Sequence, residues 1–271
     1  MNKRPIQSAN VVRLNSGALE TVTDAVVVEE PLEIRIGETS LAVTMRTPGH
    51  DEELAAGFLY TEGIISSPSD LADVRHCNAE QAGEHAGNIV VVTLALGVKF
   101  DAAQCTRHFY ATSSCGVCGK ASIEQIRQRI EPISSAIRVP PALITSLPDK
   151  MRSAQRVFGD TGGLHAAALF DLDGNLKCLR EDVGRHNAVD KVIGSAVLHQ
   201  ELPLDNHVLL VSGRAGFEIV QKACIAGVPI LAAVSAPSSL AVELALESNM
   251  TLIGFLRGAE MNIYAGSDRI A

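Results

Sequence analysis

The sequence has few aromatic residues and no apolar run long enough to cross a membrane as a helix. Of its 271 residues none is Trp, three are Tyr and seven are Phe, which disfavours aromatic platforms for single-stranded nucleic acid. A membrane helix needs about 20 apolar residues in succession, whereas the longest apolar runs here, such as 89–96, have the length of a strand. The net charge of −8 provides no protein-wide positive field to attract a polyanion. We therefore expect neither a nucleic-acid nor a membrane partner.

A secretory signal and a disulfide framework are absent as well. The first residues are basic, but no apolar segment follows them. We therefore expect a cytoplasmic protein, whose thiols are kept reduced. Six cysteines are too few for a disulfide scaffold in a chain of this length. Hydrophobic residues make up 46% and charged residues 20% of the chain, a composition typical of a globular protein with one large or two modest domains.

The first half of the sequence predicts a smaller α+β domain at residues 24–140, preceded at 1–23 by a tail or an edge strand. Alternating residues on both sides of Gly37 predict a hairpin. Helical spacing after Asp51 predicts a helix that ends at Gly63. The remaining expectations are an irregular stretch at 66–88, a strand at 89–96, a loop at 104–120, a helix at 122–130 and a proline-rich boundary at 132–148.

The second half, residues 141–271, predicts a second domain built on a sheet. Asp173-Gly174-Asn175 between two apolar runs is a strong hairpin signal. Beyond it, strands and helices alternate with short links, which favours a largely parallel sheet covered on both faces. The expected strands are 164–170, 176–179, 207–211, 230–234, 251–256 and 261–264, and the expected helices are 187–198, 217–225 and 238–247.

The sharpest local feature is a cysteine pair, Cys115-Gly-Val-Cys118, in the loop at 104–120. A pair at this spacing suits three chemistries: half of a zinc site, a dithiol–disulfide couple, or a persulfide carried on one cysteine. Each needs a reactive thiolate, which Lys120 and a following helix N-terminus would favour. Glycines beside the pair predict a mobile backbone.

The residues alone leave these alternatives open. A zinc site would need Cys105 and His108 as further ligands, so a zinc-stabilised adaptor or metallochaperone using the Cys105–Cys118 loop stays possible in principle. A thioredoxin-like couple would follow a strand directly, and here a long loop intervenes. The other three cysteines are expected to pack as small hydrophobic residues: Cys77, Cys178 and Cys224.

Three polar loops, 181–187, 212–216 and 235–239, each follow an expected strand and precede a helix. In an open parallel sheet such loops meet at the carboxyl edge, where ligands bind. Arginines, hydroxyls and helix N-termini there suit phosphate groups. The weaker binding candidates are Arg185, His186, Ser212 and Arg214. A single histidine such as His165 is more often a core residue than a ligand, and because Ala166-Ala167 follows it, the His-x-Glu of a zinc deaminase is missing.

Taken in order, the motifs resemble those of the formate dehydrogenase accessory sulfurtransferase family, FdhD, from about residue 30 to the C-terminus. The Glu181–Lys191 motif is highly specific, and the cysteine pair alone is not. The motifs are Cys115-Gly-Val-Cys118-Gly, Gly162-Gly-Leu-His165-Ala-Ala-Ala, Glu181-Asp-Val-Gly-Arg-His-Asn-Ala-Val-Asp-Lys191, Ser212-Gly-Arg214, Ser235-Ala-Pro-Ser-Ser239 and Gly254-Phe-Leu-Arg-Gly258.

The resemblance implies a fold and a function. It implies a homodimer whose C-terminal domain is a cytidine-deaminase-like, three-layer αβα sheet without deaminase activity. It also implies a sulfur carrier: a cysteine desulfurase places a persulfide on Cys115, with Cys118 in a supporting role. The sulfur then passes to the molybdenum of Mo-bis(molybdopterin guanine dinucleotide), which is bound as a substrate, before the cofactor enters formate dehydrogenase. The implied binding motif for the guanine nucleotide ends is Gly254, Phe255, Leu256, Arg257, Gly258 and Ala259.

Overall fold

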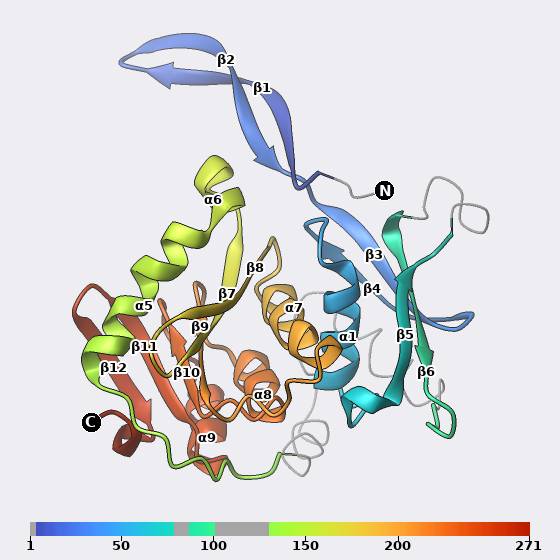
Figure 1. The fold of residues 1–271 in the computed structure, drawn as a ribbon. Helices are drawn as coiled ribbons and strands as arrows, with labels where there is room; N and C mark the ends of the chain where they lie inside the picture. The colour runs from blue at the N-terminus through green and yellow to red at the C-terminus, as the bar shows by residue number, and fades with distance from the viewer. Residues whose placement is uncertain (1–3, 79–86, 101–129) are drawn as a thin grey trace.

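The chain forms two sheets with helices between them and an arm that projects from the body (Figure 1). The structure is a computed structural model, and it describes residues 4–78, 87–100 and 130–271. The expected loop at 104–120, with Cys105, Cys115 and Cys118, and the expected helix at 122–130 therefore fall almost wholly outside the described residues. In the part that is described, no helix is long and apolar enough to cross a membrane.

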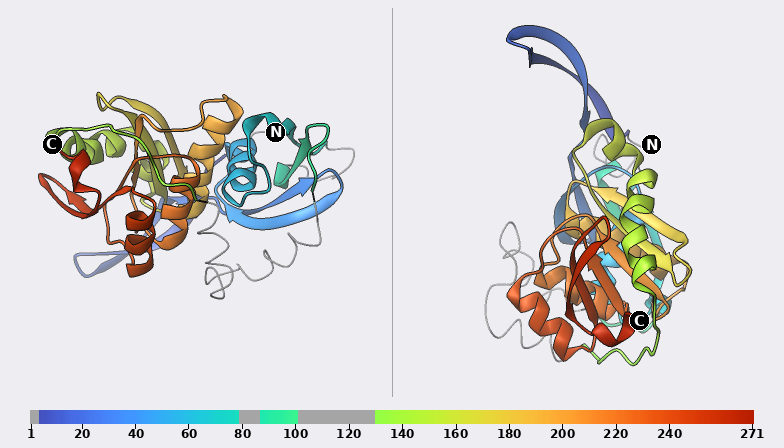
Figure 2. Two further views of the ribbon diagram at one scale, coloured as in Figure 1. Left: turned by 90° about the horizontal axis from the view of Figure 1, so that it is seen from below. Right: turned by 90° about the vertical axis from the view of Figure 1, so that its left-hand side faces the viewer.

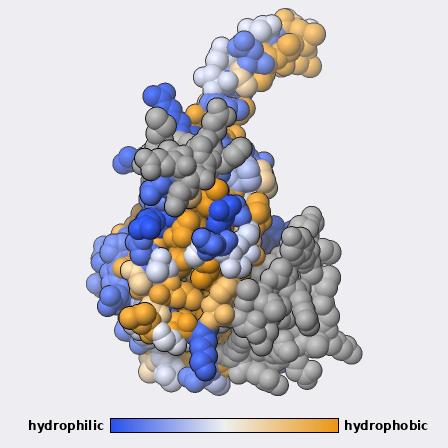
Figure 3. All heavy atoms as spheres, turned by 90° about the vertical axis from the view of Figure 1, so that its right-hand side faces the viewer, coloured by the Kyte–Doolittle hydropathy of each residue, from blue (hydrophilic) through white to orange (hydrophobic). Residues whose placement is uncertain are grey.

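The N-terminal residues form a hairpin rather than a tail. β1 (Ile6–Asn15) pairs antiparallel with β2 (Ala18–Val27) along its whole length, with a turn at Ser16-Gly17. This arm extends beyond α6 and away from both sheets (Figure 2). Its far end is apolar and exposed (Figure 3), since Val12, Leu14 and Leu19 have 66%, 68% and 73% of their surface accessible. Most residues of the arm are polar or small, so the sequence lacks a strand-like apolar alternation there.

The four-stranded sheet has the order β4-β3-β6-β5. As expected, a hairpin precedes a helix and the strand near residue 90. The stretch at 66–88, which was expected to be irregular, contains a short helix and a strand, β5, at the edge of the sheet. The stretch is polar because one side of this strand faces solvent. The elements are β3 (Glu30–Ile36), β4 (Thr39–Arg46), α1 (Asp51–Thr61), the 3-10 helix η1 (Pro68–Asp70), β5 (Leu71–His76) and β6 (Ile89–Leu94).

The six-stranded sheet has the order β12-β11-β10-β9-β7-β8 and is mixed. The pairs β9–β10 and β10–β11 are parallel, while β7 and β12 run antiparallel to the strands beside them. The expectation of a largely parallel sheet was wrong, because the hairpins at both ends each reverse one strand. The strands are β7 (His165–Asp171), β8 (Leu176–Asp182), β9 (His207–Val211), β10 (Ile230–Ala233), β11 (Thr251–Arg257) and β12 (Glu260–Ala265).

Helices cover both faces of this sheet, as expected. α5 packs on one face through Ile144, Leu147 and Met151, and the other face lies against the larger core. The prolines of this segment predicted a boundary, but the segment forms helix α5 instead. Pro141 occupies the first position of the helix, where proline is favoured. Burial of the apolar side of α5 outweighs the cost of Pro148 in the helix interior. The helices are α5 (Pro141–Ala154), α6 (Arg156–Thr161), α7 (Arg185–Leu198), α8 (Phe217–Ile225), α9 (Ser239–Glu247) and η3 (Ser267–Arg269).

α1 and α7 join the two sheets through an unusually close contact. A Cβ on Gly57 would lie 1.9 Å from the Asp190 carbonyl oxygen, and one on Gly194 would lie 1.7 Å from that of Glu53. Only glycine permits this approach. One apolar core consequently runs from the four-stranded sheet through α1 and α7 to the six-stranded sheet. The division into domains at 140/141 stays a prediction.

Candidate functional site

One edge of the six-stranded sheet collects the polar loops. β8, β9, β10 and β11 all end there, and β7, which is antiparallel to β8 and β9, begins there at His165. The loops at 212–216 and 235–239 meet directly, since Ala215 and Pro237 form a bridge. The expectation that these loops lie together is confirmed. We call this edge the carboxyl rim, defined by His165, Arg185, His186, Ser212, Arg214 and Arg257.

Ser212 and His165 are held side by side at the rim. The Ser212 hydroxyl accepts a hydrogen bond from the Ala166 amide at 2.9 Å, and the Ser212 amide donates to the Ala166 carbonyl at 2.9 Å. A Cβ on Gly213 would lie only 3.3 Å from His165 Nδ1 and 3.9 Å from Arg185 Cβ. His165 is half-buried rather than a core residue. The sequence feature that could have indicated the position of His165 is the glycine pair Gly162-Gly163, which allows the chain to turn before β7 begins at the rim.

The surroundings of the two rim histidines lower the pKa of both, which favours the uncharged ring. Burial lowers the pKa of His165, and the neighbouring Arg185 lowers it further while Asp182 opposes the shift. Burial, followed by the charges of Arg185 and Lys222, lowers the pKa of His186 to about 3. His186 Nε2 lies 3.1 Å from the Glu218 carboxylate, a contact that a neutral ring makes by donating an N–H. The positive charge of the rim therefore comes from its arginines.

The segment Gly254–Ala259 presents some of its side chains to solvent and buries one. Phe255 has φ 53°, a strained conformation for an aromatic residue, and its amide donates to the Ser235 carbonyl at 3.1 Å. Arg257 is exposed, and its Nε donates to the Val234 carbonyl at 3.2 Å. Leu256 is fully buried in the core beneath α5. Of this predicted binding motif, Phe255, Arg257, Gly258 and Ala259 are thus accessible to a ligand, and Gly254 and Leu256 are not.

The Glu181–Lys191 motif is largely a joint between the two sheets. Asp182 and Lys191 form a buried ion pair at 2.6 Å, and both contact Thr47 of the first half. The Lys191 ammonium donates to the Thr47 carbonyl at 2.9 Å, and the Thr47 backbone amide donates to the Asp182 carboxylate at 3.2 Å. Asn187 donates to Asp182 at 2.9 Å and to the Met45 carbonyl at 2.8 Å. This role was not expected from the sequence, in which its only local signal is the spacing of Asn187 and Lys191 on one helix face.

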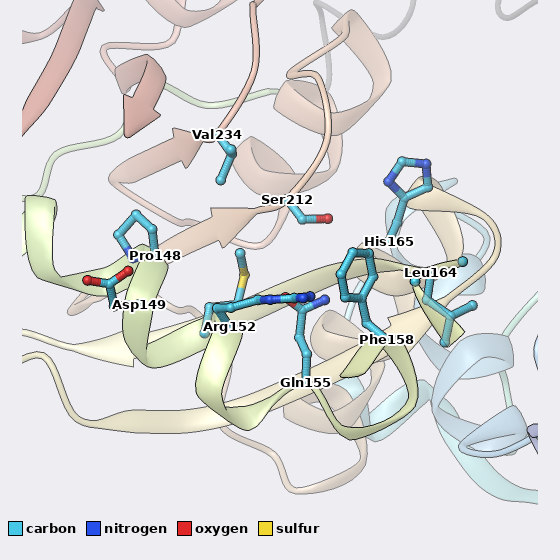
Figure 4. Close-up of a pocket in the computed structure, with 12 residues that line it drawn as sticks. Pro148, Asp149, Arg152, Gln155, Phe158, Leu164, His165, Ser212 and Val234 are labelled. Atoms are coloured by element: carbon cyan, nitrogen blue, oxygen red, sulfur yellow. The ribbon is translucent and has the colours of Figure 1, made fainter. Parts of the chain in front are cut away.

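A pocket of about 700 Å³ adjoins the rim between α5–α6 and the ends of β9 and β10 (Figure 4). Glu181 fixes its outer wall, since its carboxylate accepts hydrogen bonds from the Val157 and Phe158 amides at 3.1 and 2.8 Å. Ser212 and His165 belong both to the pocket and to the rim. The other lining residues that carry chemistry are Asp149, Arg152, Gln155 and Phe158.

Two of the described cysteines, Cys178 and Cys224, are poorly suited to sulfur chemistry, as their expected packing role implies. Cys224 lies inside α8 and is buried, and burial raises its pKa to about 11. Burial also raises the pKa of Cys178 in β8. A protonated thiol is a weak nucleophile. Among the residues with described positions, no cluster of three or more His, Cys, Asp or Glu side chains could hold a metal ion.

Fold and site together define a mixed α/β protein with arginines at one edge of its six-stranded sheet and a pocket beside that edge. The family model described as FdhD/NarQ matches residues 27–271. The sulfur carrier protein FdhD of Streptomyces coelicolor is 54% identical over 99% of this chain and 96% of its own length, and that of Mycobacterium tuberculosis is 52% identical over 96% of each.

A solved structure shares the fold. It is the crystal structure of a protein from Desulfotalea psychrophila, described provisionally as a formate dehydrogenase accessory protein, with a TM-score of 0.79 and 24% identity over 99% of this chain and 100% of that one. The chain belongs to the FdhD/NarQ family.

Proposed function

We propose that this protein is a sulfurtransferase that takes persulfide sulfur from a cysteine desulfurase and passes it to Mo-bis(molybdopterin guanine dinucleotide), for use by formate dehydrogenase. The observation that carries the proposal is that the chain belongs to the FdhD/NarQ family and contains the cysteine pair Cys115 and Cys118. The arginines of the carboxyl rim support it, because the substrate carries several phosphates. The proposal includes a cytoplasmic homodimer and a cytidine-deaminase-like second domain that lacks deaminase activity.

Loading is a thiol–persulfide exchange. The Cys115 thiolate attacks the terminal sulfur of the desulfurase persulfide, and the desulfurase cysteine leaves as a thiolate. The product is a Cys115 persulfide, with no net oxidation. Of the described cysteines, Cys178 and Cys224 compete poorly, because burial raises the pKa of both thiols.

Delivery to the substrate requires the terminal sulfur to leave as sulfide, which needs two electrons. Cys118 supplies them when its thiolate attacks Cys115 Sγ: a Cys115–Cys118 disulfide forms, and hydrosulfide is released to the metal of the substrate. A thiol reductant then restores the pair. This places Cys118 in the supporting role that the resemblance implies. The rim arginines, Arg185, Arg214 and Arg257, hold phosphate groups of the substrate.

The test is mass spectrometry of the protein after incubation with a cysteine desulfurase and cysteine. We expect one added sulfur, about 32 Da, on the peptide that contains Cys115. Cys115→Ala should abolish the addition, and Cys118→Ala should keep it. Cys178→Ala is the matched control, and it should label like the parent. Equal labelling of the Cys115→Ala protein would refute the assignment.

Metal analysis of the purified protein separates the sulfur carrier from the zinc adaptor that the sequence left open. Stoichiometric zinc that is lost in a Cys105→Ala variant would favour the adaptor. In cells that lack the parent protein, the Cys115→Ala, Cys118→Ala double variant should fail to restore formate dehydrogenase activity yet bind GDP normally. Full rescue by that variant would show that the pair is not the sulfur path.

A further inference from the structure

The N-terminal arm formed by β1 and β2 has one face that carries no charge and ends in apolar side chains. Val12 and Leu14 alternate along β1, and Leu19 lies opposite Leu14 in the β1–β2 pair, so the three side chains share this face. All three are exposed. The charged residues of the two strands lie on the other face, where Arg13 and Asp24 form an ion pair at 3.5 Å. Apolar side chains gathered on an exposed, uncharged face indicate contact with another molecule.

The far end of the arm lacks the support that a two-stranded sheet needs. A hairpin of two strands is marginally stable in water and gains stability when its apolar face packs on another element. The arm meets the body at its base, where a Cβ on Gly163 would lie 3.0 Å from the Val27 side chain. The far end extends away from both sheets (Figure 2). Packing that supports the far end therefore has to come from another molecule.

A second exposed apolar surface lies on the four-stranded sheet. Val43 and Met45 of β4 have 65% and 48% of their surface accessible. In the β3–β4 register they lie opposite Glu33 and Pro31, which alternate along β3 with the fully buried core residue Leu32. Val43 and Met45 therefore belong to the face of the sheet that is turned away from the core. We call this surface, defined by Val43 and Met45, the β4 outer face.

The size of the arm favours one kind of partner. Each of its strands has ten residues. At about 3.3 Å per residue and about 4.8 Å between strands, one face of the arm covers roughly 330 Å². Docked on a different protein, the arm would bury about 700 Å² on the two sides together, less than the about 1,200 Å² of a stable interface. A two-fold axis between two copies repeats the contact, so the buried area reaches about 1,300 Å². The area therefore favours a second copy of this chain.

We propose that two copies of the chain exchange arms, so that the uncharged face of each arm packs on the β4 outer face of the other copy. Val12, Leu14 and Leu19 of one copy then lie against Val43 and Met45 of its partner. Because the contact is reciprocal, both surfaces are covered in both copies and the assembly closes as a dimer. The inference rests on the proposed function, which includes a homodimer, and it names the surfaces that form this homodimer.

The test is sedimentation velocity of the full chain over a series of concentrations from nanomolar to micromolar. We expect the parent to dimerise. The double variant Leu14→Asp, Leu19→Asp should raise the dissociation constant of the dimer about a hundredfold or more, because unpaired charges would be buried in the contact. Val43→Asp should act in the same direction for the same reason. The matched control is Leu246→Asp in α9, which is 60% exposed and lies on neither surface, and it should dimerise like the parent.

A mixture of the two kinds of variant tests the reciprocity. When the Leu14→Asp, Leu19→Asp protein is mixed with the Val43→Asp protein, one contact of the mixed dimer joins an unaltered arm to an unaltered β4 outer face. We therefore expect dimers in the mixture at concentrations at which each variant alone is monomeric. If the Val43→Asp protein dimerises like the parent, or if the mixture shows no recovery, the arm exchange is refuted.

A milder variant guards against a loss of folding. Leu14→Thr, Leu19→Thr keeps residues that favour strands and should weaken the dimer about tenfold. Every variant should keep the far-ultraviolet circular dichroism spectrum of the parent, because the altered side chains are exposed. If the threonine variant folds and dimerises like the parent, the arm does not form the contact and the proposal is overturned.

The outcome is separable from that of the sulfur-carrier proposal. A parent chain that stays monomeric at micromolar concentration would overturn the arm exchange and the homodimer together, and it would leave a different protein as the partner of the arm. Dimers that ignore the arm substitutions would refute the arm exchange alone. Sulfur loading on Cys115 is measured by mass spectrometry in either case and tests the carrier role independently.

Discussion

Replacing Gly194 by Ala should destabilise the protein severely, because it forces two helix backbones apart. The added Cβ would lie 1.7 Å from the Glu53 carbonyl oxygen and 2.7 Å from the Gly57 nitrogen, where real Cβ atoms keep at least 3.0 Å. No side chain can rotate to relieve a clash with backbone. α7 must therefore move from α1 by more than about 1 Å, a case of overpacking that costs about 3 kcal/mol or more.

The movement would also stretch a polar contact that crosses the same interface. The hydroxyl of Thr61 in α1 donates to the carboxylate of Asp190 in α7 at 2.8 Å. For a chain of this size about 3 kcal/mol corresponds to a drop in melting temperature of about 6–12 °C. Thermal unfolding followed by circular dichroism at 222 nm measures it.

Gly159→Ala is the matched control. It lies in α6, and no atom would come within 4 Å of the added Cβ. Since alanine is the better helix former, the control should be neutral or stabilised by about 0.5–1 kcal/mol. If Gly194→Ala melts like the parent or like Gly159→Ala, the close approach of α1 and α7 described above is wrong.

Three further outcomes follow from the structure. Lys191→Met should lower the free energy of unfolding, measured in urea, by about 3–5 kcal/mol, because Asp182 is left buried with its charge uncompensated. The double variant Lys191→Met, Asp182→Asn should recover part of this loss. If the effects of the two single substitutions simply add in the double variant, the pairing of Asp182 with Lys191 is contradicted. Burial alone would raise the pKa of Glu53, but Arg180 and His50 lower it to about 2. The resulting stabilisation, at most about 3 kcal/mol, is present above pH 4.5 and is lost as the pH falls towards 2, so Arg180→Met should flatten the acid limb of the stability curve. Arg257→Ala should weaken GDP binding about tenfold with little change in melting temperature, since its side chain is exposed, and unchanged affinity by calorimetry would count against a role for the Gly254–Ala259 segment.

Local patterns in the sequence predicted most elements of the second half. The hairpin around Gly174, the strand at 207–211 and the helix begun by Ser238 all lie where expected, because turn glycines, β-branched runs and helix caps act over a few residues. Prediction failed where neighbours decided the outcome. α5 contains Pro148 and yet forms, because its apolar side is buried on the sheet. The strands of the N-terminal arm pair with each other along a mostly polar sequence.

The sequence by itself determined the family and the positions of the chemistry-bearing motifs, since these are runs of adjacent residues. It also placed three strand-end loops at one edge of a sheet, because that follows from strand order. Only the tertiary structure decided what the longest motif does: Asp182 and Lys191 meet Thr47, which lies in the other half of the chain. The pocket likewise depends on α5 and α6 packing beside Ser212. Contacts between residues so far apart in sequence leave no local pattern, because the chain between them can take many paths before the core forms.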